Sequence, residues 1–241
     1  MPEFLEEYLV SDYLCSVAII TLVPTPVGNL EDMSFRAIRV LQEADLIAAE
    51  DTRTSSVLLK HYHIATHMVS LHAHNEHSRV QELLQKIETE NLNLAVISDA
   101  GTPGISDPGF LIVREALRMG IEVITLPGPT AFVPALVSSG IPCDRFVFEG
   151  FLPVKKGRHT RLKALVSESR TIILYESPHR LNRTLKDLAE SLGIERRICV
   201  SREISKKFET HHRLTLAEAC LYFEKHPAKG EIVLTIEGNE E

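Results

Sequence analysis

Short apolar runs alternate with amphipathic stretches along most of the 241-residue chain. The compact apolar runs predict strands at Val17–Val23, Leu46–Ala49, Leu94–Ser98, Glu122–Leu126, Phe146–Glu149, Thr171–Tyr175, Ile198–Ser201 and Glu231–Ile236. Apolar residues at helical spacing predict helices at Ser34–Ala44, Glu76–Glu88, Gly109–Met119, Thr130–Ser138, Arg158–Ser167, Pro178–Ser191 and Thr215–Glu224. This alternation of strands and helices predicts an α/β protein.

A domain boundary is expected where glycine and proline interrupt the pattern between Glu149 and Gly157. We therefore expect an N-terminal α/β domain over residues 1–148 and a C-terminal α/β domain over residues 149–241. Each is long enough to bury a core of its own.

Composition narrows the class of protein. The chain is 44% hydrophobic and 24% charged, as is usual for a soluble globular protein. No apolar run approaches the roughly 20 residues of a membrane span, and residues 1–12 lack the basic start of a signal peptide. The net charge of −7 argues against a general nucleic-acid coat, so any such contact should be a local basic patch. The cysteines form no C-x-x-C pair, so we expect no metal and a reducing, cytoplasmic location.

Loops rich in glycine and proline follow several of the predicted strands, at Pro24–Asn29, Asp99–Gly109, Pro127–Ala131 and Glu176–Arg180. In α/β proteins ligands bind beyond the carboxyl ends of strands, so these loops predict a small-molecule pocket. Neither G-x-G-x-x-G nor G-x-x-x-x-G-K-[ST] occurs, and Asp99 and Asp107 would repel phosphate. The loops favour a neutral or cationic ligand, and S-adenosylmethionine is one of several that fit.

Other polar clusters leave alternatives open. The segment Glu50–Arg53 could hold a ligand amine or start a helix capped by Asp51 or Thr52. The segment His72–Glu76 could form a substrate-facing turn or the start of a helix, and it lacks a third metal ligand nearby. A basic cluster could dock RNA phosphates or form a solvated helix face; its residues are Lys155, Lys156, Arg158, Arg161 and Lys163.

Several of these motifs together resemble the tetrapyrrole methylase superfamily, and within it the members that modify ribosomal RNA. The resemblance is carried by PTPVGNLEDMSFRA, AAEDTRTS, HAHNE, SDAGTPGISDPGF, LPGPTAFVPALVSSGIP, FEGFLP, YESPHR, SREISKKFE and GEIVLTIEG. The motif SDAGTPGISDPGF is the most specific, because porphyrin-modifying relatives have a G-D-P-x-x-Y type of loop where this chain has Gly101–Ser106.

The resemblance implies two α/β domains with S-adenosylmethionine in the cleft between them, and a homodimer. The implied reaction is methylation of the ribose 2′-hydroxyl of a cytidine in small-subunit ribosomal RNA. The expected cofactor contacts are Val27, Asp99, Ala100, Gly101, Thr102, Ile105, Thr130, Ala131, Tyr175, Glu176, Ser201 and Glu231. For Asp99 and Asp107 two roles stay open: one of them could cap the helix that starts at Gly109, while the other faces the sulfonium or the RNA.

A ribose hydroxyl is a poor nucleophile, so a base or a nearby charge should assist methyl transfer. We expect the methyl-accepting side of the site to be lined by Glu50, Asp51, Arg53, His74 and Glu76. Arg53 could stabilise the developing alkoxide. Two other functions stay open: methylation of a tetrapyrrole or corrinoid precursor, and a non-catalytic S-adenosylmethionine-binding module on the ribosome.

Overall fold

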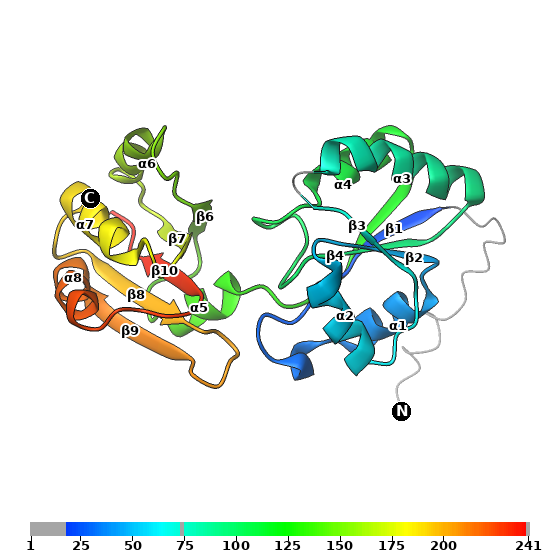
Figure 1. The fold of residues 1–241 in the computed structure, drawn as a ribbon. Coiled ribbons are helices and arrows are strands. Elements are labelled where there is room, and N and C mark those ends of the chain that lie inside the picture. Colours follow the sequence, from blue (N-terminus) through cyan, green and yellow to red (C-terminus); the bar gives the residue numbers. More distant parts are fainter. Residues whose placement is uncertain (1–17, 73–74, 240–241) are drawn as a thin grey trace, which may run out of the picture. The chain divides into compact units, whose positions relative to one another are not determined.

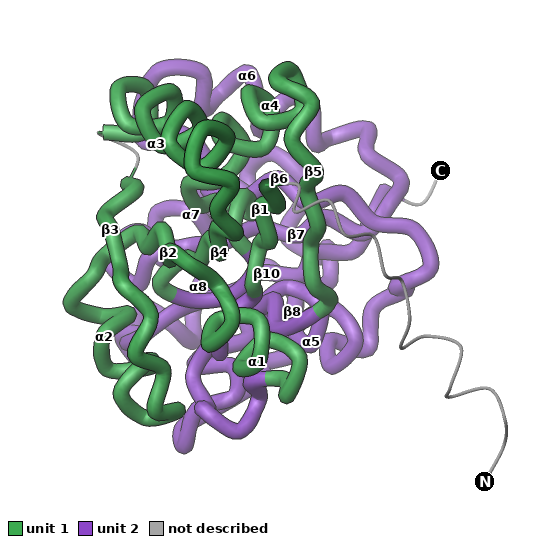
Figure 2. Tube along the Cα trace, turned by 90° about the vertical axis from the view of Figure 1, so that its right-hand side faces the viewer, with its two compact units in different colours: residues 1–23, 34–99, 103–127 green, residues 24–33, 100–102, 128–241 purple. Residues whose placement is uncertain are grey.

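The computed structural model describes residues 18–72 and 75–239, which fall into two compact units. Unit 1 holds the described part of residues 1–23, 34–99 and 103–127, and unit 2 holds residues 24–33, 100–102 and the chain from 128 onwards (Figure 2). Across the described ranges, no helix is both long and apolar enough to cross a membrane.

Unit 1 is built on a five-stranded sheet with the order β3-β2-β4-β1-β5, and all of its strand pairs are parallel. Its strands are β1 (Ile19–Leu22), β2 (Leu46–Ala49), β3 (Met68–Ser70), β4 (Leu94–Ile97) and β5 (Glu122–Thr125). Its helices are α1 (Phe35–Glu43), α2 (Thr52–His61), α3 (Glu76–Glu90) and α4 (Phe110–Arg118).

The core of unit 1 explains why β2 and β4 are apolar at every position. Helices α3 and α4 cover one face of the sheet, while α1 and α2 cover the other (Figure 1). A parallel sheet covered on both faces needs near-continuous apolar strands. Because β2 and β4 are parallel neighbours, their carboxyl ends bring the loops after Ala49 and Ile97 side by side.

Unit 2 contains a second five-stranded sheet, in the order β6-β7-β10-β8-β9. Only the β6–β7 pair is parallel. The strands are β6 (Phe146–Phe151), β7 (Thr171–Glu176), β8 (Arg197–Arg202), β9 (Thr210–Thr215) and β10 (Ile232–Ile236). The helices are α5 (Phe132–Ser138), α6 (Arg158–Leu165), α7 (Leu181–Leu192) and α8 (Leu216–Lys225), and a short 3-10 helix, η2, spans Leu30–Asp32.

The strand period of two divides the core of unit 2 between the faces of its sheet. Ile172 and Leu174 of β7 pack in the cluster that contains α7 and α8. Ile173, between them, packs in a second cluster with Ala135 of α5 and with Val27. Residues 24–33 therefore contribute side chains to the core of unit 2, although they follow the first strand of unit 1.

The expected α/β class is confirmed, and each predicted strand and helix lies at or within a few residues of an observed one. Four elements were not predicted as such: the 3-10 helix η2, α2, β3 and β9. Strand β3 is only three residues long, and β9 is polar, with the sequence THHRLT. We expected the N-terminal domain to reach residue 148. Unit 1 instead ends at Pro127, because α5 and β6 pack with unit 2.

Candidate functional site

Loops that follow β1, β4 and β5 are joined to one another within unit 2. Thr25 and Gly101 exchange two backbone hydrogen bonds of 2.9 Å each. The Thr102 hydroxyl lies 3.0 Å from the Pro129 carbonyl oxygen and 2.7 Å from the Thr130 hydroxyl. The three segments predicted to touch one ligand therefore form one continuous surface.

This close approach depends on small residues. A Cβ atom at Gly128 would lie 2.7 Å from Cβ of Pro24, so a larger residue would push the first and third loops apart. Gly101 has a φ of 86°, which glycine adopts readily. Around Gly101, Thr102 and Thr130 the loops offer backbone groups and hydroxyls.

An apolar cluster supports these loops within unit 2. Val27, which is buried, packs with residues of α5, β7 and β10, and Ala131 and Tyr175 lie against the same cluster. The Tyr175 ring lies edge-on to Phe148, with 5.0 Å between ring centroids. Val27, Ala131 and Tyr175 were predicted separately as cofactor contacts, and the structure brings them together.

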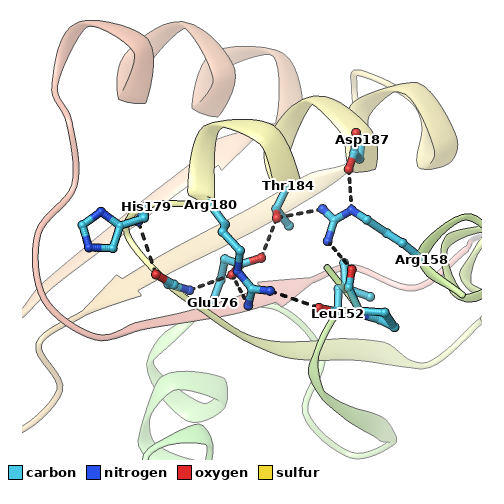
Figure 3. Close-up of polar contacts among 9 residues, drawn as sticks. Leu152, Arg158, Glu176, His179, Arg180, Thr184 and Asp187 are labelled. Atoms are coloured by element: carbon cyan, nitrogen blue, oxygen red, sulfur yellow. Dashed lines mark hydrogen bonds and ion pairs between the residues drawn. The ribbon is translucent and has the colours of Figure 1, made fainter. Parts of the chain in front are cut away.

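Glu176, also predicted as a cofactor contact, is 3% exposed and bound on all sides by protein groups. Its carboxylate accepts hydrogen bonds from the Ser177 amide at 2.7 Å and from the Thr184 hydroxyl, and pairs with Arg180 at 2.8 Å (Figure 3). These contacts tie the end of β7 to the start of α7. The side chain of Glu176 holds this turn in place, and its role in cofactor binding stays a prediction.

The expectation that Arg158 binds RNA is wrong for the folded chain. Arg158 is 5% exposed, and its guanidinium donates to Asp187 at 2.6 Å, to Thr184 at 2.9 Å and to the Pro153 carbonyl at 3.2 Å (Figure 3). Arginine suits such a buried position because its planar group carries several donors in a fixed arrangement.

The other members of the basic cluster are exposed. Arg161 forms an ion pair with Glu149 at 3.1 Å, and Lys155, Lys156 and Lys163 lie on the surface of the α6 region. The cluster is therefore smaller than its sequence indicated. Its role in binding RNA stays a prediction.

Two more predicted cofactor contacts already bind protein groups. Ser201 is fully buried, and its hydroxyl lies 2.9 Å from Nδ1 of His211, whose Nε2 lies 2.8 Å from Glu209. Glu231 is exposed and pairs with Lys206 at 2.9 Å. The Ser201 hydroxyl therefore links strand β8 to strand β9 through His211 and is not presented to a ligand.

In unit 1, the loops after β2 and β4 bring carboxylates together. The Asp51 amide donates to the Asp99 carboxylate at 3.1 Å, and the Asp99 amide donates to Glu50 at 3.4 Å. These residues border a cavity of about 360 Å³, lined by Glu50, Asp51, Thr52, Arg53, Ser70, His72 and Asp99. Sequence reasoning did not single out Ser70, because a lone serine at the end of a short strand carries no signal.

Asp51 caps helix α2, which confirms the helix-start alternative at this segment. Its carboxylate accepts from the Arg53 amide at 2.8 Å and forms an ion pair with the Arg53 side chain at 2.8 Å. The hydrogen bonds from Arg53 lower the pKa of Asp51 to about 2, so it is an anion at neutral pH. Arg53 is held at the cavity by this pair, and its side chain is 90% exposed.

Three carboxyl groups in unit 1 have raised pKa values. Burial is the main cause of the raised pKa at Glu50 and at Asp99. Burial, together with the nearby charges of Glu50 and Asp99, raises the pKa of Asp107 to about 7. The sequence drew attention to Asp107 but did not predict its raised pKa. Neither the burial of its side chain nor the approach of Glu50 and Asp99 follows from the local sequence.

The start of helix α4 differs from the expectation that Asp99 or Asp107 caps it. The amide of Gly109, at the N-terminal end of α4, donates instead to the carboxylate of Glu76 at 3.2 Å. Glu76 thus ties the start of α3 to the loop that carries Asp107. His74, the remaining predicted catalytic residue, lies outside the described residues.

Solved structures share this fold at low sequence identity. The crystal structure of a diphthine synthase aligns with a TM-score of 0.71 at 13% identity and covers 91% of this chain and 90% of its own. A uroporphyrin-III-C-methyltransferase from Thermus thermophilus aligns with a TM-score of 0.66 at 18% identity, over 91% of this chain and 94% of its own.

Sequence relatives are much closer. Proteins named ribosomal RNA small subunit methyltransferase I are 52% identical in Synechocystis sp., over 92% of this chain and 80% of the relative, and 47% identical in Escherichia coli O157:H7, over 91% and 77%. The relative of that name from Thermotoga maritima is 44% identical, over 91% of this chain and 98% of its own. The family model of the tetrapyrrole (corrin/porphyrin) methylases matches residues 20–220. The chain therefore belongs to the tetrapyrrole methylase family.

Proposed function

We propose that the protein is an S-adenosylmethionine-dependent methyltransferase of small-subunit ribosomal RNA, and that it methylates the ribose 2′-hydroxyl of a cytidine. The observation that carries this proposal is the 44% to 52% identity to relatives named ribosomal RNA small subunit methyltransferase I, over nine-tenths of the chain. Structural neighbours named as a uroporphyrin-III-C-methyltransferase and a cobalt precorrin-4 methyltransferase are below 20% identical and support the fold alone.

The joined loops of unit 2 suit S-adenosylmethionine, a cation that carries no phosphate. They offer backbone groups, two hydroxyls and small apolar side chains. We assign contacts to Val27, Ala100, Gly101, Thr102, Thr130, Ala131 and Tyr175, and keep Asp99 and Ile105 of unit 1 as further proposed contacts. When bound, this cofactor supplies an electrophilic methyl group on a positively charged sulfur.

The carboxylate cluster of unit 1 supplies candidates for the proton acceptor. A general base works best when its pKa lies near the working pH, and Asp107 meets this condition. We assign the Asp107 carboxylate to take the proton from the 2′-hydroxyl, with burial raising its pKa and the charges of Glu50 and Asp99 adding to that effect. Arg53, which Asp51 positions, is assigned to stabilise the negative charge that develops on the ribose oxygen.

A second copy of the chain is part of the proposal. Val133 and Val137 lie one helical turn apart on α5 and are 47% and 68% exposed, and Phe146 at the start of β6 is 40% exposed. Exposed apolar residues on neighbouring elements mark interaction surfaces. This supports a homodimer formed through α5 and β6.

Methyl labelling tests the proposed function. Protein is incubated with methyl-labelled S-adenosylmethionine and small ribosomal subunits that lack the modification, and the labelled nucleotide is mapped. We expect label on one ribose 2′-oxygen of the RNA and its loss in Asp107→Asn, with Asp144→Asn, an exposed carboxylate on unit 2, as the control. Label on a tetrapyrrole but not on RNA, or cofactor binding without any transfer, would contradict the proposal.

A further inference from the structure

The loop between β8 and β9, residues 203–209, is held in one conformation by its own hydrogen bonds. Glu203 and Ser205 have φ values of 53° and 65°, a left-handed conformation that non-glycine residues rarely adopt. The Ser205 amide donates to the Glu209 carboxylate at 2.6 Å, and the Lys206 amide donates to the Glu203 carbonyl at 3.0 Å. Such a conformation persists only where the surroundings determine it.

This loop packs against the segment that follows β1. The Ser205 hydroxyl donates to Asp32, and Ile204 packs with Val27 in the same apolar cluster. A Cβ atom at Gly28 would lie 2.4 Å from Cγ of Lys206. The β8–β9 loop therefore lies directly beside a segment to which we assign cofactor contacts.

Residues 207–209 of the loop are exposed. The Glu209 carboxylate is bound to the Ser205 amide and to His211, whereas Lys207 and Phe208 present their side chains at the surface. Lys206 pairs with Glu203 at 3.1 Å and with Glu231 at 2.9 Å, so its single charge is shared between two carboxylates. Lys207 and Phe208 are exposed, and the Phe208 ring is 70% exposed. The Lys207 ammonium lies 5.6 Å from the centroid of that ring.

We propose that Phe208 stacks on an unpaired base of the RNA substrate and that Lys207 binds the adjacent phosphate. An exposed aromatic ring beside a cation matches single-stranded RNA, which presents a flat base and an anionic phosphate in alternation. The rigidity of the loop favours binding, because little entropy is lost when a preformed surface takes its ligand. The inference rests on the proposed function in that the substrate is RNA.

Binding to a fluorescent, unstructured 12-nucleotide RNA of cytidine and uridine tests the platform without methyl transfer. We expect Phe208→Ala to weaken binding by about 5- to 100-fold, which is the usual effect of losing one stacked base. Phe208→Trp should bind as tightly as the parent, whereas Phe208→Leu should not, since it keeps apolar area but lacks a ring. Lys207→Ala should reduce the slope of log affinity against log salt by about 0.7.

Leu221→Ala is the matched control, because Leu221 is also exposed, at 62%, but lies on α8. Equal affinity of the parent and Phe208→Ala, or no binding of the probe by the parent, would overturn the platform. A loss of affinity for intact small subunits but not for the RNA probe would also overturn it and assign Phe208 to a protein contact. Binding through Phe208 without methyl transfer would instead overturn the proposed function and leave the platform standing.

Discussion

At the scale of single residues, burial decides what a charged side chain does. Arg158 and Arg161 lie one helical turn apart in one basic stretch of sequence, yet Arg158 is buried and Arg161 is exposed. A buried arginine must have its donors satisfied, and Asp187, Thr184 and Pro153 satisfy those of Arg158. The same distinction separates Asp107, whose pKa is raised by burial, from the exposed carboxylates.

Replacement of Arg158 by alanine should lower the free energy of unfolding by about 3 kcal/mol, because it removes a buried guanidinium that binds Asp187, Thr184 and the Pro153 carbonyl. Arg161→Ala removes an ion pair in which the arginine side chain is 54% exposed and that of Glu149 is 12% exposed, and it should cost less than Arg158→Ala because a single contact is lost. Chemical denaturation of both variants measures the difference. Equal losses would contradict the structural role that we give to Arg158.

Asp107 should make the stability of the protein depend on pH. Its pKa is about 7 in the folded chain against an ordinary value of 3.8, so the folded state binds its proton more tightly than the unfolded state. The contribution of this carboxyl to the free energy of unfolding is fully present below about pH 4 and decreases as the pH rises to about 7. Asp107→Asn removes this decrease, so at pH 8 its melting temperature should exceed that of the parent.

Thermal unfolding between pH 4 and pH 8 measures this effect, with Asp144→Asn as the control for loss of an exposed carboxylate. Parallel pH profiles of the parent and Asp107→Asn would show that the pKa of the Asp107 carboxyl is not raised in the folded protein.

At the scale of elements, the loop between β4 and α4 is shaped by contacts within its own turn. The amide of Gly104 donates to the Pro108 carbonyl at 3.0 Å, and Gly109 has a φ of 139°. A Cβ atom at Gly109 would lie 2.9 Å from the Gly104 nitrogen. The loop closes on itself so tightly that only glycine fits at the point where helix α4 begins.

Gly109 combines an unusual backbone angle with a lack of space for a Cβ atom. Gly109→Ala should therefore destabilise unit 1 more than an alanine substitution at a glycine that has the unusual angle but free space around it. Gly120, with a φ of 77° and open space around its Cβ position, provides that comparison. We expect Gly120→Ala to cost about 1–2 kcal/mol and Gly109→Ala at least about 1 kcal/mol more. Equal losses in chemical denaturation would mean that the turn relaxes around the added methyl group.

At the scale of the whole molecule, the proposed homodimer depends on a single helix face. Ala135 and Leu136 of α5 are buried in unit 2, while Val133 and Val137 remain exposed. A helix that is apolar on both sides needs a second partner to cover the outer side.

Val137→Glu should convert the dimer to a monomer, because it places a charge in the apolar centre of the contact. Light scattering coupled to gel filtration measures the mass of each species. Leu221→Glu, which adds the same charge at an exposed position of α8, should leave the mass unchanged. A monomeric parent protein, or a dimeric Val137→Glu variant, would contradict this interface.

The sequence by itself determined the elements and the fold class. Strands such as Leu46–Ala49 and helices such as Phe35–Glu43 follow from the local spacing of apolar residues, which a single chain displays without any tertiary information. The glycine- and proline-rich loops were recognised for the same reason. Strand β9 was not predicted, because its polar sequence has no apolar alternation and it forms a strand by pairing with β8.

Only the tertiary structure decided which polar residues are free to act. Arg158, Glu176 and Ser201 look like site residues in the sequence, and each is buried against protein partners. Those of Arg158 lie far along the chain, that of Ser201 lies across a hairpin, and those of Glu176 lie in the turn and helix that follow β7. Conversely, Asp107 gains its raised pKa and Phe208 its rigid support from residues that are distant in sequence. The physical reason is that hydrophobic periodicity is local, whereas the burial and pairing of polar groups depend on how distant segments pack.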